Sequence, residues 1–412
     1  MSSAHMENHR VPLKHMSVRA TLPADWKKGT FIGRVWRPDV KGPSIVTLGK
    51  DGYLYDITAS FSTVSKLLEE KNPAAAARQA QARGEKLGSM SDILTHTQSG
   101  SPRRPTLMAP IDLQAIKAAG VTFAVSLVER LVEEKCKGDA KKAPEIRSRI
   151  EMELHGEELS ELKPGSPEAL RIKDYLIKEL GFAHHYLEVG LGLMGEVFTK
   201  GQPMSAVGHG SPAGLHPESA WNNPEPEVVL ALSSKGKIVG AALGNDVNLR
   251  DIEGKSALLL GECKDQRASC AVGPLLRLFD QSFTLADAKT MDVGLHIKGK
   301  DGFELHDGSS MKKISRAPES IVGQMFGHHD YPDGAVLFCG TMFSPTTPRG
   351  KHTGFTHEYG DTVTIQSDKL GSLTNVMVST EAAPKWKMGT RALMENLAER
   401  GVRGAQDRGR ET

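Results

Sequence analysis

The sequence is poor in cysteine and aromatic residues, and it has no large excess of charge of either sign. Its four cysteines show no CxxC spacing. This excludes a disulfide framework, so we expect reduced, structural thiols and a cytoplasmic protein. The 52 Lys and Arg residues nearly balance the 50 Asp and Glu residues, which leaves a formal charge of +2. A charge this small argues against nucleic acid or an acidic membrane surface as a partner.

Long apolar runs are also missing. No segment approaches the ~18 apolar residues that a membrane-spanning helix requires. Residues 1–16 lack the apolar region of a secretory signal, and we leave them out of the fold prediction. The composition, 39% apolar and 25% charged, is typical of a soluble globular protein. The length favours two to three domains of ~150 residues each.

Glycine is the residue type in excess, with 42 residues where an average composition would give ~7%. Glycine next to β-prone residues favours many strands and tight turns. Residues 18–65 are predicted to form short strands, with a hairpin turn at 49–52. The polar segment 99–105 then predicts the end of a small β-rich N-terminal domain, residues 17–105.

Residues 106–180 are predicted to form a helical connecting segment. Residues 126–134 carry an amphipathic apolar stripe, and Ser166-Pro167-Glu168 is a typical helix start. Strands prevail in 181–412, including 186–193, and helices are expected only at the three segments 247–260, 275–283 and 316–326. Without regularly alternating helices, this pattern favours an α+β fold with a mixed β-rich core over a doubly wound parallel sheet.

Three carboxylates stand out in the predicted core. Glu225 and Glu227 lie two residues apart, on one face of an apolar strand. Asp246 follows after a hairpin turn, at the end of the returning strand. Such a group suits a hard cation, namely Mg²⁺, Mn²⁺ or Ca²⁺, because burial of adjacent carboxylates is otherwise costly. The alternative is a pair of surface carboxylates on an edge strand.

Two cationic residues follow these carboxylates. Lys264 lies between an apolar run and a Gly-Pro turn, where it could act as a desolvated base or stabilise negative charge. The alternative is a solvated surface lysine. Arg250 follows Asp246 by four residues and could bind a substrate carboxylate.

Other patterns are interpreted as structural. Residues 190–195 match GxGxxG, but we expect no helix to follow and hence no dinucleotide site. The pairs His184–His185 and His328–His329 lack accompanying metal-ligand spacing, so we interpret them as structural or surface histidines.

Five motifs in order resemble the fumarylacetoacetate hydrolase superfamily. They are PEPEVVLAL, GNDVNLRD, the lysine before ASCAVGP, GAVLFCGT and GDTVTIQSDKLGSLTN. Segments such as APIDLQAIKAAGVTFA and FTKGQPMSAVG are similar to its sugar-acid branch, whose members are 2-keto-3-deoxy-pentonate dehydratases. The resemblance implies a β-sandwich or roll for the core and a homodimer or homotetramer.

The resemblance also implies a set of site residues. It places Mg²⁺, or Mn²⁺, on the carboxylate triad and gives Lys264 a catalytic role. The small-molecule sugar acid would then be bound by Arg250, Gly340, Thr341 and the segment Gln202–Ser205, while the metal ligands are Glu225, Glu227 and Asp246.

One departure from the hydrolytic members predicts the reaction. These members carry a helix with the pattern N-Y-x-x-H-x-x-E. Residues 126–133 resemble this helix, with Arg130 at the position of its histidine and Glu133 at the position of its glutamate. Arginine is no general base at neutral pH, so we predict loss of water rather than C–C hydrolysis. In this prediction Lys264 assists removal of a C3 proton. Glu133, aided by Arg130, then protonates the departing C4 hydroxyl, and the product is 2,5-dioxopentanoate.

Two alternatives stay open. The first is a metal-dependent acylpyruvate or diketo-acid C–C hydrolase, which a histidine such as His184 or His216 near the metal would support. The second is a non-catalytic protein that binds small acids, which an absence of metal binding would favour.

Overall fold

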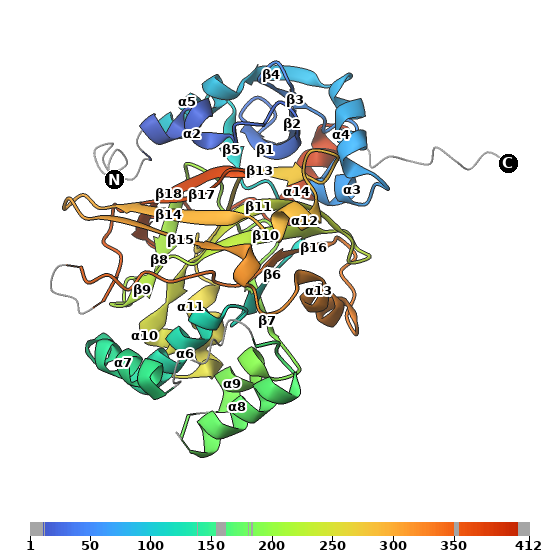
Figure 1. Ribbon diagram of the computed structural model, residues 1–412. Coiled ribbons are helices and arrows are strands. Elements are labelled where there is room, and N and C mark those ends of the chain that lie inside the picture. Colours follow the sequence, from blue (N-terminus) through green and yellow to red (C-terminus); the bar gives the residue numbers. More distant parts are fainter. Residues whose placement is uncertain are drawn as a thin grey trace.

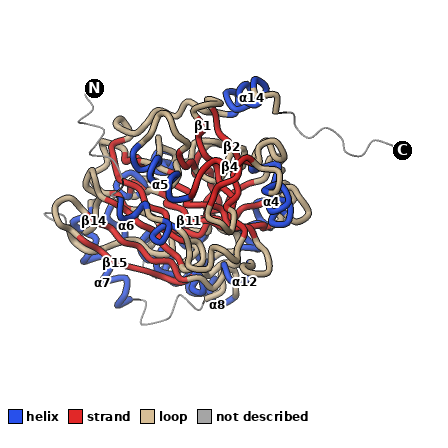
Figure 2. Tube along the Cα trace, turned by 90° about the horizontal axis from the view of Figure 1, so that it is seen from above, coloured by secondary structure: helices blue, strands red, loops and turns tan. Residues whose placement is uncertain are grey.

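The structure is a computed structural model. It describes residues 11, 13–137, 139–153, 162–179, 181–182, 184–349 and 354–402. Strands fill the middle of the molecule and most helices lie around them (Figure 2). Within the described ranges, no helix is both long and apolar enough to cross a membrane.

The main sheet has eleven strands in the order β4-β3-β2-β1-β13-β11-β10-β16-β6-β7, with β5 paired to β1 (Figure 1). All its pairings are antiparallel except that of β16 with β6. Its strands are β1 Thr30–Arg37, β2 Gly42–Leu48, β3 Tyr53–Asp56, β4 Glu85–Ser89, β5 Thr106–Met108, β6 Ala115–Gly120, β7 Glu196–Gly201, β10 Pro226–Leu232, β11 Ile238–Asp246, β13 Cys270–Leu278 and β16 Ala335–Phe338.

A second sheet of five strands has the order β15-β14-β17-β18-β8. Its strands are β8 Pro212–Leu215, β14 Asp292–Lys298, β15 Glu304–Ser310, β17 Thr362–Ser367 and β18 Gly371–Ser379. Strands β9 Asn222–Asn223 and β12 Asn248–Leu249 form a small pair. Leu230 and Leu243 of the main sheet share one buried cluster with Ile297 and Ile365 of the second. Burial of these side chains holds the two sheets together.

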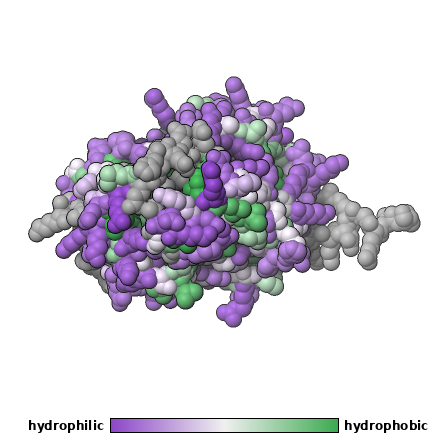
Figure 3. Space-filling view, turned by 60° about the horizontal axis from the view of Figure 1, so that its bottom comes forward, coloured by the Kyte–Doolittle hydropathy of each residue, from purple (hydrophilic) through white to green (hydrophobic). Residues whose placement is uncertain are grey.

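Four helices gather at one end of the main sheet: α6 Ala124–Cys136, α7 Ala143–Glu153, α8 Pro167–Lys178 and α9 His184–Leu191 (Figure 1). Figure 3 brings this end forward and shows a mostly polar surface with small apolar groups. The other helices are α2 Val18–Thr21, α3 Val64–Leu68, α4 Pro73–Gln81, α5 Met90–Ser99, α10 Arg250–Glu253, α11 Leu260–Lys264, α12 Leu285–Ala288, α13 Pro318–Phe326 and α14 Thr390–Glu399, with 3₁₀ turns η1 Leu13–Met16, η2 Ala140–Lys142, η4 Ala257–Leu259 and η5 Met311–Lys313.

The predicted α+β fold with a β-rich core is confirmed. The expected turn at 49–52 joins β2 to β3, and the Ser166 side chain caps α8 by accepting the Ala169 N–H at 3.2 Å. The predicted domains 17–105, 106–180 and 181–412 stay a prediction, and the main sheet takes strands from all three segments.

Three local predictions are wrong. Of 186–193, predicted to be a strand, residues up to Leu191 belong to helix α9, and 115–120 is strand β6 within a segment predicted to be helical. Of 275–283, predicted to be a helix, residues up to Leu278 belong to β13. All nine residues of β13 are buried, and a short run without a polar face gives no periodicity by which to distinguish strand from helix.

The glycine pattern at 190–195 contributes to packing. Gly190 lies in α9, and a Cβ there would approach the side chains of Leu127 and Val121 at 3.0 Å. The absence of a side chain therefore lets α9 lie close against α6.

Candidate metal centre and active site

Strands β10 and β11 bring the three predicted carboxylates together. Glu225 precedes β10, Glu227 lies within it, and Asp246 ends β11. The pairing of Pro226 with Asn245 sets this register. Glu225, Glu227 and Asp246 are each 1% exposed, and one oxygen from each lies within 4.8 Å of the others. The edge-strand surface alternative is therefore wrong.

Glu227 is the carboxylate with the least compensation. It accepts a hydrogen bond from the Gly340 N–H at 2.7 Å, and the Thr341 hydroxyl lies 3.5 Å away. It has no ion pair with any residue the structure describes. Burial, and then repulsion from Asp246 and Glu225, raise the pKa of Glu227 well above its usual value. A divalent cation between these oxygens would remove that repulsion, so the donor set fits a hard metal ion.

Two buried lysines lie beside the triad. Lys264, at the end of α11, bonds to Glu225, and its Nζ lies 3.4 Å from Asp246 Oδ2. It is 1% exposed, so the solvated-surface alternative is wrong. Burial opposes its charge, but Asp246, Glu225 and Glu253 outweigh burial and raise the pKa of Lys264. Lys264 is therefore an ammonium group in this structure and is suited to stabilising negative charge.

Lys200, which the sequence analysis missed, is the second lysine. Its Nζ lies 2.9 Å from Asp246 Oδ1 and donates to the Val247 carbonyl at 3.3 Å and to the Lys264 carbonyl. Lys200 sits where the pairing of β6 with β7 shifts register. A bulge at this point redirects the side chain, and no alternation pattern would have predicted its direction.

Helix α6 supplies a network of alternating charges. Arg130 donates to Glu225 at 3.0 Å, to Glu133 at 2.7 Å and to Glu253. Glu133 also lies 2.7 Å from Arg250 Nε. Arg130 thus contacts the triad directly, whereas Glu133 is linked to it through Arg130. Within the described residues, no histidine takes part in the hydrogen bonds and ion pairs of this network.

The predicted substrate-binding residues have partners in this structure. Arg250 bonds to Glu129 at 2.6 Å and its guanidinium lies 4.6 Å from the centre of the Trp221 ring. It therefore contacts α6 and Trp221. The Gln202 amide donates to Asp265, the neighbour of Lys264, at 2.9 Å, and the Ser205 hydroxyl bonds to the Gln202 carbonyl at 2.7 Å.

Two further carboxyl groups were missed by the sequence analysis. Burial raises the pKa of Glu253 to about 7, against the opposing effects of Arg130 and Lys264. Burial also raises the pKa of Glu196, at the start of β7. Among the described residues, no hydrogen bond or ion pair holds the Glu196 carboxyl. The sequence around Glu196 predicted a short strand and carried no signal for the role of its carboxyl group.

Comparison with known proteins identifies the core. Residues 194–378 match the family model "Fumarylacetoacetate (FAA) hydrolase C-terminal". We call this matched segment, a little under half of the chain, the hydrolase domain. All five motifs that carried the resemblance lie inside it, and the resemblance is confirmed. The hydrolase domain contains the carboxylate triad and Lys264, whereas Arg130 and Glu133 reach it from outside the matched range.

Curated relatives of the hydrolase domain include two archaeal proteins. The chain is 32% identical over 179 residues to the 2-dehydro-3-deoxy-D-arabinonate dehydratase of Saccharolobus solfataricus, covering 43% of this chain and 57% of that one. It is 31% identical over 181 residues to the "Probable 2-keto-3-deoxyxylonate dehydratase" of Haloferax volcanii, covering 44% and 59%. The alignments thus span less than two thirds of the length of either relative.

Solved structures resemble a larger part of the chain. The structure of a "2-keto-3-deoxy-D-arabinonate dehydratase complexed with magnesium and 2,5-dioxopentanoate" covers 85% of this chain and 99% of its own, with 21% identity and a TM-score of 0.55. The apo form gives 21% identity and a TM-score of 0.56. These similarities establish a shared fold beyond the hydrolase domain.

Proposed function

We propose that this protein is a divalent-cation-dependent dehydratase that converts a 2-keto-3-deoxy-pentonate to 2,5-dioxopentanoate. One observation carries the proposal: a buried Glu225-Glu227-Asp246 triad is bonded to Lys264 and Arg130, and no histidine base joins it in the described residues. Loss of water requires no activated water nucleophile, whereas C–C hydrolysis does. The names of both curated relatives support the dehydratase class.

Glu225, Glu227 and Asp246 would hold the cation, which we propose to be Mg²⁺, with Mn²⁺ as a substitute. Three carboxylates without a nitrogen or sulfur ligand favour such hard ions. A divalent ion there would polarise a 2-keto acid and make its C3 protons more acidic. The magnesium in the complex of the similar dehydratase supports this choice.

The residues around the triad would stabilise charge. Lys264 would hold the negative charge that develops on the 2-keto oxygen as a C3 proton leaves. Lys200 would keep Asp246 in position through their 2.9 Å contact. Arg130 would orient Glu225 while remaining charged.

We assign the proton donor to Glu196 rather than to Glu133, the residue that the resemblance implied. Glu133 lies between the guanidinium groups of Arg130 and Arg250, 2.7 Å from each, and two such partners stabilise a carboxylate. The Glu196 carboxyl has no such partner among the described residues, and its pKa is raised. A raised pKa favours the protonated form of this carboxyl group, which is the form that a proton donor requires.

The proposed reaction balances as follows. The C3 proton passes to solvent, the C4 hydroxyl leaves as water after protonation by Glu196, and a C3–C4 double bond forms. Glu196 then regains a proton from solvent. Transfer of a C5 proton to C3 then gives the C4–C5 enol of an aldehyde. Tautomerisation of this enol yields 2,5-dioxopentanoate, so one water molecule is lost overall.

The test is product analysis. The protein is incubated with 2-keto-3-deoxy-D-xylonate, or with an arabinonate isomer, in the presence of Mg²⁺, and a semialdehyde dehydrogenase with NAD⁺ reports the product. We expect 2,5-dioxopentanoate to form and EDTA to abolish its formation. Cleavage of an acylpyruvate to pyruvate and an acid, without dehydration of any of these substrates, would overturn the proposal.

The histidines that could have supported a hydrolase lie elsewhere. His184 is exposed and lies 3.7 Å from Glu188, and His216 accepts a hydrogen bond from the Glu218 N–H. Neither bonds to the triad. We therefore propose no second function.

A further inference from the structure

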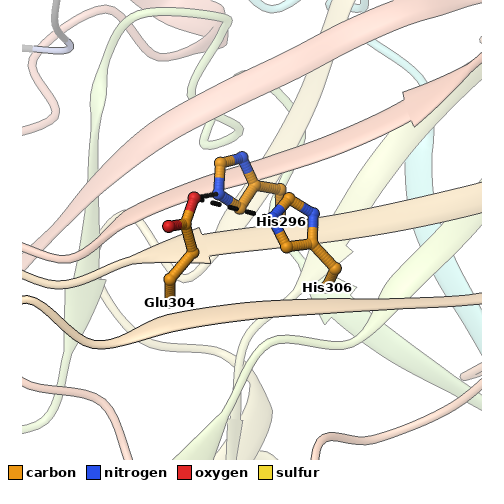
Figure 4. Close-up of side chains that lie close together, drawn as sticks. All are labelled: His296, Glu304 and His306. Carbon is orange, nitrogen blue, oxygen red and sulfur yellow. Dashed lines mark hydrogen bonds and ion pairs between the residues drawn. The ribbon is translucent and has the colours of Figure 1, made fainter.

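A second group of metal-binding side chains lies on the edge hairpin of the five-stranded sheet, formed by β14 and β15. His296 of β14 and His306 of β15 are direct cross-strand partners. Glu304 precedes His306 by two residues, so its side chain is on the same face. Figure 4 shows the three side chains together above this hairpin.

The three side chains converge on one point. Glu304 Oε1 lies 2.8 Å from His296 Nε2 and 3.5 Å from His306 Nε2. The two imidazole rings are stacked, with centroids 4.0 Å apart and planes 14° apart. One ligand atom from each residue lies within 4.8 Å of the others. A small rotation of each side chain would therefore place all three around a single ion.

The donor set differs in chemistry from the carboxylate triad. Two imidazole nitrogens and one carboxylate oxygen suit a borderline ion such as Zn²⁺, which takes four ligands in a tetrahedral arrangement. The side chains of His296, Glu304 and His306 are 19%, 50% and 68% exposed. An ion can therefore reach the group from solvent, and a water molecule can complete the coordination.

The neighbouring charges define the strength of such a site. Lys298, directly opposite Glu304 on the paired strand, is a cation that competes for the carboxylate. The ring centroid of His15 lies 6.5 Å from that of His296. His15 and His296 also line a groove of about 1280 Å³ beside the hairpin. We expect weaker binding than at a four-residue structural zinc site.

We propose that His296, Glu304 and His306 bind one Zn²⁺ ion at a site separate from the catalytic triad, and that this ion fastens edge strand β15 to β14. Strand β15 has a partner on one side only. Two ligands come from β15 and one from β14, so the bound ion crosslinks the pair. The proposal is independent of the proposed dehydratase activity.

The first test measures Zn²⁺ binding by the full-length protein and by its variants. It uses isothermal titration calorimetry in excess Mg²⁺. We expect His306→Gln and Glu304→Gln each to weaken one class of Zn²⁺ site at least ~10-fold, and the His296→Gln/His306→Gln pair to remove it. His328→Gln, which changes an exposed histidine elsewhere, is the matched control and should bind Zn²⁺ as the unaltered chain does.

Two spectroscopic measurements make the outcome decisive. Co²⁺ in place of Zn²⁺ should give the visible absorption of a four-coordinate ion in the unaltered chain and lose it in the paired variant. Zn²⁺ should also raise the Tm of the unaltered chain but not that of the paired variant. Circular dichroism verifies that each variant is folded. Equal Zn²⁺ stoichiometry and affinity in the unaltered chain and the folded paired variant would overturn the proposal.

Discussion

At the scale of single residues, the chemistry depends on how each buried charge is compensated. Glu225 is bonded to Lys264 and Arg130, and these two cations outweigh burial and hold the pKa of Glu225 below its usual value. Glu227, two residues further along, is not ion-paired within the described chain, and its pKa is raised. Two glutamates separated by one residue thus have opposite electrostatic surroundings, and the uncompensated one indicates where a cation belongs.

The first prediction concerns Glu227. Glu227→Gln should lower turnover by more than the ~10–100-fold that outer-shell partners of a metal contribute. The metal-free protein should keep its Tm or gain stability, because the substitution removes a buried carboxylate that is repelled by its neighbours. Steady-state kinetics with Mg²⁺ and thermal unfolding with EDTA measure the two effects. Glu262→Gln, at an exposed glutamate on α11, is the control. Near-normal activity of Glu227→Gln in excess metal would contradict the triad assignment.

The second prediction concerns Lys264. Lys264→Met should lower kcat by ~10²-fold or more, since it removes a preorganised ammonium beside the developing negative charge. Lys255→Met, at an exposed lysine, should leave kcat unchanged. Kinetics of both variants, with metal content measured for each, separate loss of chemistry from loss of metal. An unchanged kcat in Lys264→Met would remove this lysine from the mechanism.

At the scale of elements, helix α6 is tied to the hydrolase domain by charge rather than by apolar packing alone. Arg130 links the helix to Glu225, just before β10, and to Glu253 of α10. Arg250 of α10 forms ion pairs with Glu129 and Glu133 of α6. Because removal of one member leaves a buried partner uncompensated, this network is sensitive to the protonation of its carboxyl groups.

The third prediction follows from Glu253. Its folded-state pKa of about 7 lies above the ordinary value of 4.5. The folded chain therefore binds more protons than the unfolded chain between these values. The free energy of unfolding therefore falls as pH rises from about 4.5 to about 7. The loss amounts to about 3 kcal/mol at 1.36 kcal/mol per pKa unit.

Urea unfolding of the metal-free protein at pH 5, 6 and 8 measures this slope. Glu253→Gln should flatten it, whatever the variant's absolute stability, because glutamine does not titrate. Asp265→Asn, which removes a carboxyl group close to Lys264 but outside the Arg130 network, controls for a general charge effect. The same pH slope in the unaltered chain and Glu253→Gln would contradict the prediction.

At the scale of the whole molecule, the N-terminal strands are part of the main sheet. Thr30–Ile32 of β1 pair with Leu276–Leu278 of β13. A buried cluster also joins N-terminal side chains such as Val35 and Leu54 to Leu275 and Val376. Removal of the N-terminal strands would expose both the edge of β13 and this apolar surface. The homodimer or homotetramer implied by the resemblance stays a prediction.

The fourth prediction is that the chain unfolds in one transition. The shared sheet and core couple the segment 17–105 to the remainder, so the calorimetric enthalpy should equal the van't Hoff enthalpy. Scanning calorimetry at several protein concentrations tests this and also reveals any effect of assembly on Tm. A separate transition of the N-terminal segment would contradict it and would support an independent domain with its end at 105.

The candidate site was predictable where it depends on local pattern. The two-residue spacing of Glu225 and Glu227, and the hairpin that returns to Asp246, follow from strand periodicity and a short turn. Lys264 stood out locally but received its role, as Arg130 and Glu133 did, through the resemblance. Glu196, Glu253 and Lys200 were missed because the local sequence gives no indication of which distant residues a charged side chain will contact.

The sequence by itself determined the β-rich fold and the carboxylate hairpin. Only the tertiary structure decided which charges meet, because Arg130 and Glu225 are 95 residues apart and no local periodicity describes such a contact. It likewise decided that 184–191 is a helix and 115–120 a strand. Packing against distant elements outweighs the small free-energy differences between local conformations.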